Sequence, residues 1–549
     1  NLLHTYQQCL RNLLMGSEEK LVRWNPEDFP LANLNQEQLN IAVSGITDLQ
    51  DIYPLAPVQE GIIFHANYEI EKDIYLQQVT GQITGDLNVE IFKSAWENCI
   101  NHYSILRTSY IWESLPRPLA RVHSTVNLPF VYQDWCGTDD WEQKWSDLLM
   151  EDRQQGFSME RPPLMRLILV KTDKAKWRFC WTHHHVLIDG WSLPLVFQHV
   201  ISFYQAEQKH QFLKWPPVPN YRDFIVWLNQ KPIQQAEVFW RDQLAGLDSV
   251  TKIGLTSDPL DNGADYQVLQ TTLQPEVYAQ LKNYANKHLV TVSTLINAAW
   301  AILISKYSGS NEVIFGVTVS GRPTELSGFE QMVGLFINTL PLRLKFQPDK
   351  PVATWLKEVS DRILAISEHS YSSLVDIQGW SNINRGESLF ESIVVYENYP
   401  VGEKIRNHND DLIISDVESL EKNHYPITLY ALPGEDLTLK IAFQKIGTTK
   451  ERQQLLQHIT DILNTLVTKS PRFLGEICLP TPSLIPIKHQ PPVVTLADLF
   501  NQRVSENANS PAILQGEKWL TYGELNDQAN KIAQALVDLG VTQETLVGV

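Results

Sequence analysis

Short apolar runs alternate with segments of helical spacing along most of the chain. The runs at 164–170, 178–183, 312–319 and 392–396 have the length and composition of strands. The segments between them place apolar residues three or four positions apart, as amphipathic helices do. This alternation predicts α/β layers over residues 49–477, a stretch without an internal repeat.

The two ends of the chain have a different pattern. Residues 1–48 begin with helical spacing and become loop-like at Pro26, because the residue before a proline avoids the helical conformation. The proline-dense stretch 478–494 suits neither a helix nor a central strand, so we expect a linker there. Residues 495–549 predict a helix, a short strand and a second helix that ends at Gly540. Because the sequence starts without a methionine and stops within an apolar run, we expect a piece of a longer protein.

Composition narrows the class of protein. The chain has 549 residues, which at roughly 100–200 residues per domain predicts three to five folded units. With 43% hydrophobic and 20% charged residues it is a globular composition rather than a disordered one. The net charge of −18 argues against nucleic acid as a partner. Five scattered cysteines without metal spacing predict a reducing, cytoplasmic location, and we find neither a signal peptide nor an apolar run of membrane-spanning length.

One segment, residues 181–192, concentrates side chains that can do chemistry. Its sequence is Trp-Thr-His-His-His-Val-Leu-Ile-Asp-Gly-Trp-Ser, between a predicted hairpin and a helix that we expect Ser192 to cap. Strand alternation would place His183 and His185 on one face and His184 on the other. Such a junction between a strand and a helix is a common position for functional residues.

Four interpretations of these histidines remain. They can bind a metal, although no third ligand is placed to complete a shell. They can be buried and hydrogen-bonded without a function. They can belong to a Ser-His-Asp triad, but the chain lacks the Gly-x-Ser-x-Gly pattern around such a nucleophile. A histidine that takes a proton during acyl transfer fits best, since its unperturbed pKa lies near 6.5.

The spacing His-His-x-x-x-Asp-Gly at 184–190 resembles the signature of condensation domains of nonribosomal peptide synthetases. These domains share a superfamily with chloramphenicol acetyltransferase. Two departures stand out: Asn101 and Tyr103 replace the usual Arg and Glu, and the usual His-x-x-x-Pro-Phe is matched only loosely at 369–374. Further segments match the family's motifs in the family's order, at 53–65, 101–108, 221–227, 320–323, 333–343 and 389–400.

The resemblance implies an α/β fold of two chloramphenicol-acetyltransferase-like lobes in a V-shaped pseudo-dimer, with a tunnel between them. Residues 520–526 and 529–533 are similar to the opening of an adenylation domain, without its phosphate-binding loop, so we expect a small α/β adenylation fragment. The implied organisation is the tail of an upstream domain with a linker (1–48), an N-lobe (49–228), a C-lobe (229–477), a proline-rich linker (478–494) and the adenylation fragment (495–549).

The activity implied by the resemblance is formation of a peptide bond. A donor acyl or peptidyl thioester and an acceptor aminoacyl thioester arrive on the phosphopantetheine arms of an upstream and a downstream peptidyl carrier domain. The acceptor amine attacks the donor carbonyl and releases the donor thiol. No intrinsically bound cofactor, metal, nucleic acid or membrane is implied, and the adjoining adenylation domain is a further partner.

The resemblance also assigns roles to residues. His185 is the catalytic residue, acting as general base or positioning the amine. His184, Asp189 and Gly190 form the site's architecture together with Arg107, the expected ion partner of Asp189. A further residue, Asn338, is a candidate for the tunnel lining; its other interpretation is a hydrogen bond within a loop.

The subtype of reaction follows from two further likenesses. Residues 24–31 resemble the tail of an epimerization domain, and residues 54–65 look like the opening motif of the D-donor, L-acceptor subtype. Two other functions stay open: an epimerization domain, which shares the histidine motif, and a noncatalytic platform that recruits partner enzymes. Heterocyclization is disfavoured because that subfamily carries aspartate where His184 and His185 stand.

Overall fold

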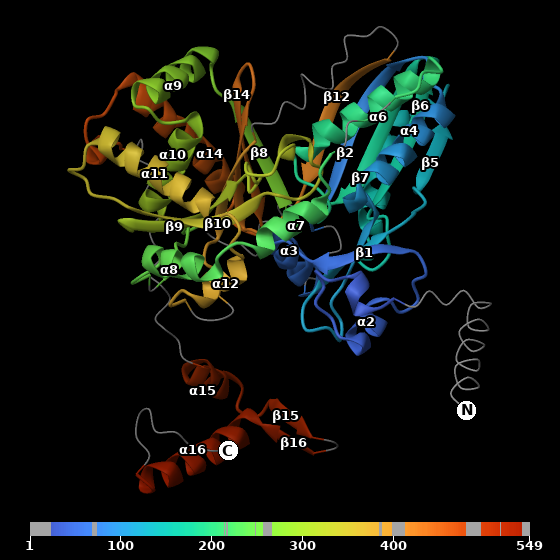
Figure 1. Cartoon of the computed structure of the whole chain (residues 1–549). Helices are drawn as coiled ribbons and strands as arrows, with labels where there is room; N and C mark the ends of the chain where they lie inside the picture. Colours follow the sequence, from blue (N-terminus) through green and yellow to red (C-terminus); the bar gives the residue numbers. More distant parts are fainter. Residues whose placement is uncertain are drawn as a thin grey trace, which may run out of the picture. The chain divides into compact units, whose positions relative to one another are not determined.

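The chain forms two compact units, one up to Leu479 and one from Pro480 onward, and each is described by itself. Figure 1 shows the computed structural model. It describes residues 24–68, 74–213, 215, 218–247, 249–255, 266–383, 387–397, 412–478, 496–515 and 518–540.

A five-stranded sheet organises the first half of the first unit (Figure 1), with the strand order β12-β2-β7-β6-β5. All its neighbours are antiparallel except β5 and β6. Trp96 of α4 and Phe197 of α6 pack on Trp181 of β7, with ring centroids 4.9 and 5.6 Å away. This aromatic cluster buries both helices against one face of the sheet. The bounds are β2 (Leu76–Gly85), α4 (Val89–His102), β5 (Phe130–Asp134), α5 (Trp141–Gln155), β6 (Met165–Asp173), β7 (Lys176–His184), α6 (Ser192–Gln208) and β12 (Leu412–Glu421).

A smaller sheet lies beside this half, with the strand order β1-β4-β3. It shares an apolar cluster with Phe29 and with Leu39 of α2. Helix α3 follows β1 directly and lies near the middle of the unit (Figure 1). The bounds are η1 (Pro26–Asp28), α2 (Gln36–Ala42), β1 (Leu49–Pro54), α3 (Pro57–Tyr68), η2 (Ser104–Arg107), β3 (Thr108–Ile111) and β4 (Leu119–His123).

The second half of the first unit is built on a six-stranded mixed sheet with the order β10-β9-β11-β13-β14-β8. Helix α10 runs through its core, where Trp300 is completely buried. Among the described residues no single helix could cross a membrane by length and hydropathy; α9 and α10 pass only as a pair bent by 102°. The bounds are α7 (Tyr221–Asn229), α8 (Ile233–Gln243), β8 (Tyr266–Thr272), α9 (Pro275–Lys287), α10 (Val292–Ser308), β9 (Glu312–Val319), η3 (Phe329–Gln331), β10 (Asn338–Lys345), α11 (Val352–Glu368), α12 (Leu374–Gly379), β11 (Ser392–Tyr396), β13 (Ile427–Pro433), β14 (Leu437–Gln444), α14 (Thr449–Thr468) and η4 (Leu474–Glu476).

Two segments beyond residue 228 complete the packing of the first half. Strand β12 pairs with β2 and forms the edge of the five-stranded sheet (Figure 1), with Glu421 opposite Gln77. Met332 and Phe336 belong to the same apolar cluster as Trp181. If the chain is divided at residue 228, these two segments belong to the second half by sequence but pack in the first half.

The predicted α/β class is confirmed, and the strands expected from the apolar runs are present as β6, β7, β9 and β11. Helix α6 begins at Ser192 as expected, but the capping role of Ser192 is wrong: the N-cap is Trp191, and the Ser192 hydroxyl binds Asp189 instead. The helical spacing at the very start of the chain lies outside the described residues.

The second unit contains α15 (Leu496–Asn507), a hairpin of β15 (Pro511–Gln515) and β16 (Lys518–Thr521), and α16 (Tyr522–Asp538). The Thr521 side chain caps α16, and Gly540, with φ +83°, follows its end as predicted. Among its described residues none of the α16 side chains is buried within the unit.

Gly334 marks how tightly the crossing segment, residues 332–336, is packed. A Cβ on Gly334 would lie 2.2 Å from Cδ2 of Tyr221, whose buried ring is held by a 2.6 Å hydrogen bond from its hydroxyl to the Leu335 carbonyl. We expect Gly334→Ala to lower the free energy of unfolding by about 1–3 kcal/mol. Chemical denaturation measures this. Gly379→Ala is the control, because its Cβ would meet no atom within 4 Å; equal stability of the two variants would contradict the prediction.

Candidate functional site

A cavity of about 340 Å³ lies within the first unit and is lined from both of its halves. The first half contributes Tyr75 and His185, and the second half contributes Asn338, Glu421 and His424. His185 follows the end of β7 and opens the loop that leads to α6. The histidine motif therefore stands at the wall of a cavity, where a substrate can reach it.

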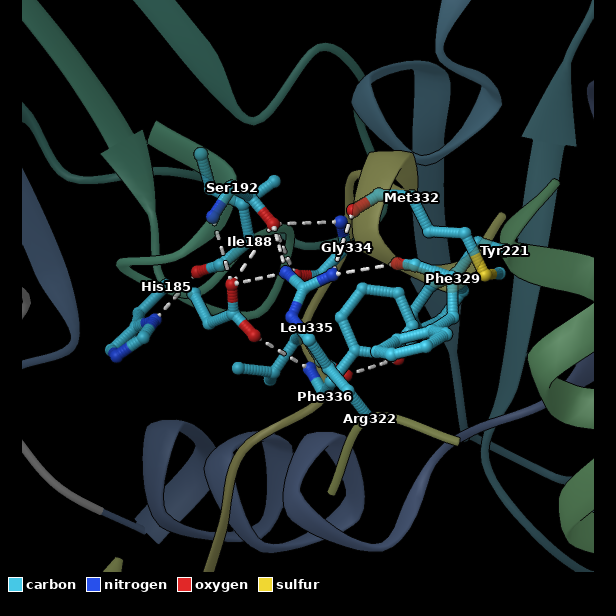
Figure 2. Close-up of polar contacts among 11 residues, drawn as sticks. His185, Ile188, Ser192, Tyr221, Arg322, Phe329, Met332, Gly334, Leu335 and Phe336 are labelled. Carbon is cyan, nitrogen blue, oxygen red and sulfur yellow. Dashed lines mark hydrogen bonds and ion pairs between the residues drawn. The ribbon is translucent and has the colours of Figure 1, made fainter. Parts of the chain in front are cut away.

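The backbone fixes the orientation of His185. Its N–H donates to the Tyr75 carbonyl at 2.8 Å, and its Nδ1 lies 2.7 Å from the Ile188 carbonyl oxygen. A carbonyl oxygen only accepts, so Nδ1 carries the proton. In the neutral ring Nε2 is then the acceptor, and it lies 3.3 Å from Oε1 of Glu421. Figure 2 shows the ring held against Ile188 at the edge of the loop.

The other two histidines of the motif are buried away from the cavity. The His183 ring packs on Trp181 with centroids 4.4 Å apart, and burial lowers its pKa well below the ordinary value. The Val186 N–H donates to Nδ1 of His184 at 3.2 Å, and burial lowers the pKa of His184 to about 3. Both rings are therefore neutral at pH 7. The expectation that His183 and His185 share one face is wrong, because β7 ends at His184 and the chain turns.

Asp189 is fully buried and its ion partner is Arg322. Nη2 of Arg322 donates to Oδ1 of Asp189 at 3.1 Å. The same carboxylate accepts from the Ser192 N–H at 3.0 Å, from the Ser192 hydroxyl at 2.9 Å and from the Phe336 N–H at 3.1 Å. A buried carboxylate needs such donors to offset its loss of hydration. These bonds tie the loop after His185 to the crossing segment.

The expected pairing of Asp189 with Arg107 is wrong. Arg107 lies at the small sheet, where its guanidinium donates to backbone carbonyls that include those of Ile100 and Ser124, each at 3.2 Å. It also donates to Oε1 of Gln50 at 2.9 Å. These carbonyl oxygens accept the N–H groups of the guanidinium, which has five N–H donors to satisfy. Arg107 therefore fixes the chain at η2 and β3 and has no bond to the motif.

The Asn338 amide lines the cavity and is also held by the backbone. Its Nδ2 donates to the Ser370 and Ser372 carbonyls at 2.8 and 2.7 Å, and its Oδ1 accepts from the Thr339 N–H at 2.8 Å. The Asn338 side chain therefore both lines the cavity and forms hydrogen bonds with the backbone, so the two interpretations of Asn338 do not exclude each other. Gly190 lines the cavity beside His185, as the resemblance implies.

The charged residues that line the described cavity wall are acidic. Glu397 and Glu421 carry carboxylates, and none of the cavity's lining residues is a lysine or an arginine. Among the described residues no group of three or more metal-ligating side chains is close enough to hold a metal ion. The site can hold a cation or a neutral amine more readily than an anion.

His185, with Nδ1 bound to the Ile188 carbonyl and Nε2 next to Glu421, thus lies at a cavity lined from both halves of a mixed α/β fold. The model of the condensation domain family matches residues 49–483, and the chain belongs to this family. The family comprises amide-forming enzymes of nonribosomal peptide synthetases, which act on carrier-bound thioesters.

Curated relatives are parts of large synthases. A linear gramicidin synthase of Brevibacillus parabrevis is 34% identical over all of this chain, which spans 7% of that protein. A mycosubtilin synthase of Bacillus subtilis is 30% identical over 95% of this chain, which spans 21% of its length.

Solved structures share the fold at low identity. The first condensation domain of the calcium-dependent antibiotic synthetase has a TM-score of 0.65 and 16% identity; the match covers 78% of this chain and 99% of that one. A four-domain nonribosomal peptide synthetase bound to AMP and glycine has a TM-score of 0.68 and 17% identity, over 90% of this chain and 39% of that one.

Three residues of the site had no role assigned from the sequence. Arg322 lies in the matched segment 320–323, and Gly334 lies in the next one, so a motif did signal both. Glu421 had no signal in the sequence, because only the pairing of β12 with β2 carries it to His185.

The corrected ion pair can be tested by double-mutant cycles. Removing either partner of a buried pair leaves an uncompensated charge, so Asp189→Asn and Arg322→Met should each cost about 3–5 kcal/mol of unfolding free energy. Their combination should cost clearly less than the sum. The matched cycle with Arg107→Met should be additive. Coupling of Asp189 to Arg107 in place of Arg322, or lost turnover at unchanged stability, would overturn the assignment.

Proposed function

We propose that this domain joins a donor acyl or peptidyl thioester to an acceptor aminoacyl thioester, both carried on phosphopantetheine arms. The observation that carries the proposal is the placement of His185: its Nδ1 is fixed by the Ile188 carbonyl, its Nε2 lies 3.3 Å from Oε1 of Glu421, and both residues line the cavity. The two halves correspond in this proposal to the chloramphenicol-acetyltransferase-like lobes, and the cavity to the middle of the tunnel between them.

The chemistry follows from the state of the ring. The acceptor nitrogen attacks the donor carbonyl carbon, the new C–N bond forms, the C–S bond breaks, and the thiolate takes up a proton. One proton leaves the nitrogen, and Nε2 is the acceptor that stands ready for it. An α-ammonium has a pKa near 8, so its deprotonation is only modestly uphill at pH 7. Holding the nitrogen at the right place therefore supplies part of the acceleration.

The partners proposed are an upstream and a downstream peptidyl carrier domain and an adjoining adenylation domain. The likeness to a gramicidin synthase runs over 100% of this chain and so continues past the condensation family's match, which supports an adenylation start in the second unit. The sequence predicts a helix, one short strand and a second helix here; the structure has two strands, paired as a hairpin, between the two helices.

His185→Ala tests the proposed activity. Loss of a proton-accepting and positioning group should lower the single-turnover rate of amide formation about a hundredfold to ten-thousandfold. Mass spectrometry of the acceptor carrier, after mixing with a loaded donor carrier, measures the product. His210→Ala, in an exposed turn after α6, is the control. A folded His185→Ala variant with the wild-type rate would refute the catalytic role.

We further propose the D-donor, L-acceptor subtype. The resemblance of residues 54–65 supports it, and four residues of this stretch line the cavity: Pro57, Val58, Gly61 and Ile62. A close-packed wall distinguishes epimers because exchanging hydrogen and side chain at the α-carbon drives the larger group into it.

The stereochemical preference can be measured by competition. Clashes of this kind cost on the order of 1–3 kcal/mol, so a D-terminal donor should react at least about tenfold faster than its L-epimer with an L-aminoacyl acceptor. An achiral glycine-terminal donor on the same carrier is the reference. Equal rates, or a faster L-donor, would remove the subtype and leave the condensation activity standing.

A further inference from the structure

We propose that Glu421 is a second substrate-binding group of the site and that its carboxylate binds the acceptor's α-ammonium beside His185. The inference rests on the proposed function, because it names the group that selects the charged form of the acceptor. It comes from the contact between Oε1 of Glu421 and Nε2 of His185, 3.3 Å apart at the cavity wall.

The strand register carries Glu421 to this place. Glu421 is the last residue of β12 and pairs with Gln77 of β2, and Gln77 pairs in turn with His183 of β7. The C-terminal ends of β12 and β7 therefore lie at the same end of the sheet, with β2 between them. The Tyr266 hydroxyl donates to the Glu421 carbonyl at 2.8 Å and holds the end of the strand. A rigid sheet edge therefore positions the carboxylate.

Glu421 contacts the nitrogen of His185 that faces substrate. In a dyad that only orients a histidine, the carboxylate binds the ring nitrogen remote from the substrate. Here that nitrogen, Nδ1, is already bound to the Ile188 carbonyl. Glu421 instead lies next to Nε2, so its carboxylate and the reacting nitrogen of the acceptor occupy the same small region of the cavity.

Nε2 of His185 and Oε1 of Glu421 can both accept a hydrogen bond, so their close contact requires a proton or a donor between them. With the ring proton at Nδ1, Nε2 of His185 has a lone pair, and the carboxylate form of Glu421 has lone pairs at Oε1. An α-ammonium supplies three N–H donors and one positive charge, which satisfies both acceptors at once. When the ammonium reacts, one of its three protons passes to the pair and frees the nitrogen's lone pair, which forms the bond to carbon. A second proton is taken up by the leaving thiolate, and the third stays on the amide nitrogen.

The contacts of the charged and titratable groups around Glu421 are compatible with a substrate ammonium at its carboxylate. Among the described residues its only ion-pair partner is His185. Tyr430 faces it, and the charge of Glu421 adds to burial in raising the pKa of that phenol, which stays neutral. His424 is within hydrogen-bond distance of the Tyr75 hydroxyl. The nearby cations, Lys422 and Arg153, contact the Tyr266 ring and the Leu420 carbonyl.

The decisive comparison uses two acceptors that differ in charge. One downstream carrier bears an aminoacyl arm, and the other bears an aminooxyacyl arm, whose weakly basic nitrogen is neutral at pH 7 yet still nucleophilic. Hydrogen bonds to charged groups contribute more than neutral ones, so Glu421→Gln should raise the KM for the aminoacyl carrier about tenfold or more. The KM for the aminooxyacyl carrier should change little, and the KM for the donor carrier should not change.

Glu418→Gln is the matched control, since Glu418 lies on the same strand, is exposed and is not among the cavity-lining residues. It should leave both acceptors unaffected. Equal losses with the two acceptors in Glu421→Gln, or no loss with either, would overturn the proposal. Failure of the proposed function is a different result: wild-type protein would form no product from either acceptor.

A binding experiment on wild-type protein decides the point even where Glu421→Gln does not fold. Without a donor, a carrier with an amide-linked arm ending in an α-ammonium should bind at least about tenfold more tightly than one ending in an α-hydroxyl. Equal dissociation constants would overturn the proposal, because the carriers are otherwise identical.

Discussion

The buried charge of Asp189 is the constraint on which the site depends. A carboxylate without access to water must find donors nearby. Arg322 and the Phe336 N–H supply them from 133 and 147 positions downstream. The loop that begins with His185 is thereby fastened to the crossing segment 332–336, which itself packs in the core of the first half. The position of the His185 ring relative to the second half therefore depends on these bonds to the Asp189 carboxylate.

The bonds between Asp189 and the second half also explain why residues of both halves line the cavity. Met332 and Phe336 enter the first half's core, and β12 forms the edge of its sheet. Asn338 continues directly from the crossing segment and reaches the cavity at the start of β10. The second half thus supplies part of the first half's structure, and residues of both halves line the cavity.

Local patterns predicted much of the fold. The runs that became β6, β7, β9 and β11 were recognised because strand burial is visible over a few residues. Helix α6 was located from its apolar spacing after the histidine motif. The motif also placed His184, His185, Asp189 and Gly190 in one short segment, which begins at the end of β7. The cap of α6 was missed because the Ser192 hydroxyl is recruited by Asp189, a neighbour in space that outweighs its tendency to cap.

What the sequence by itself determined is most of the elements, the family and the segment that holds His185, since each depends on residues close together in the chain. Tertiary structure alone decided the partners. Asp189 meets Arg322 and not Arg107, because Arg107 is used by backbone carbonyls at the small sheet. Glu421 meets His185 because β12 pairs with β2 in the register that places Glu421 opposite Gln77. Charge pairing and strand register act between segments hundreds of residues apart, and the burial that selects among the possible partners exists only once the chain has folded.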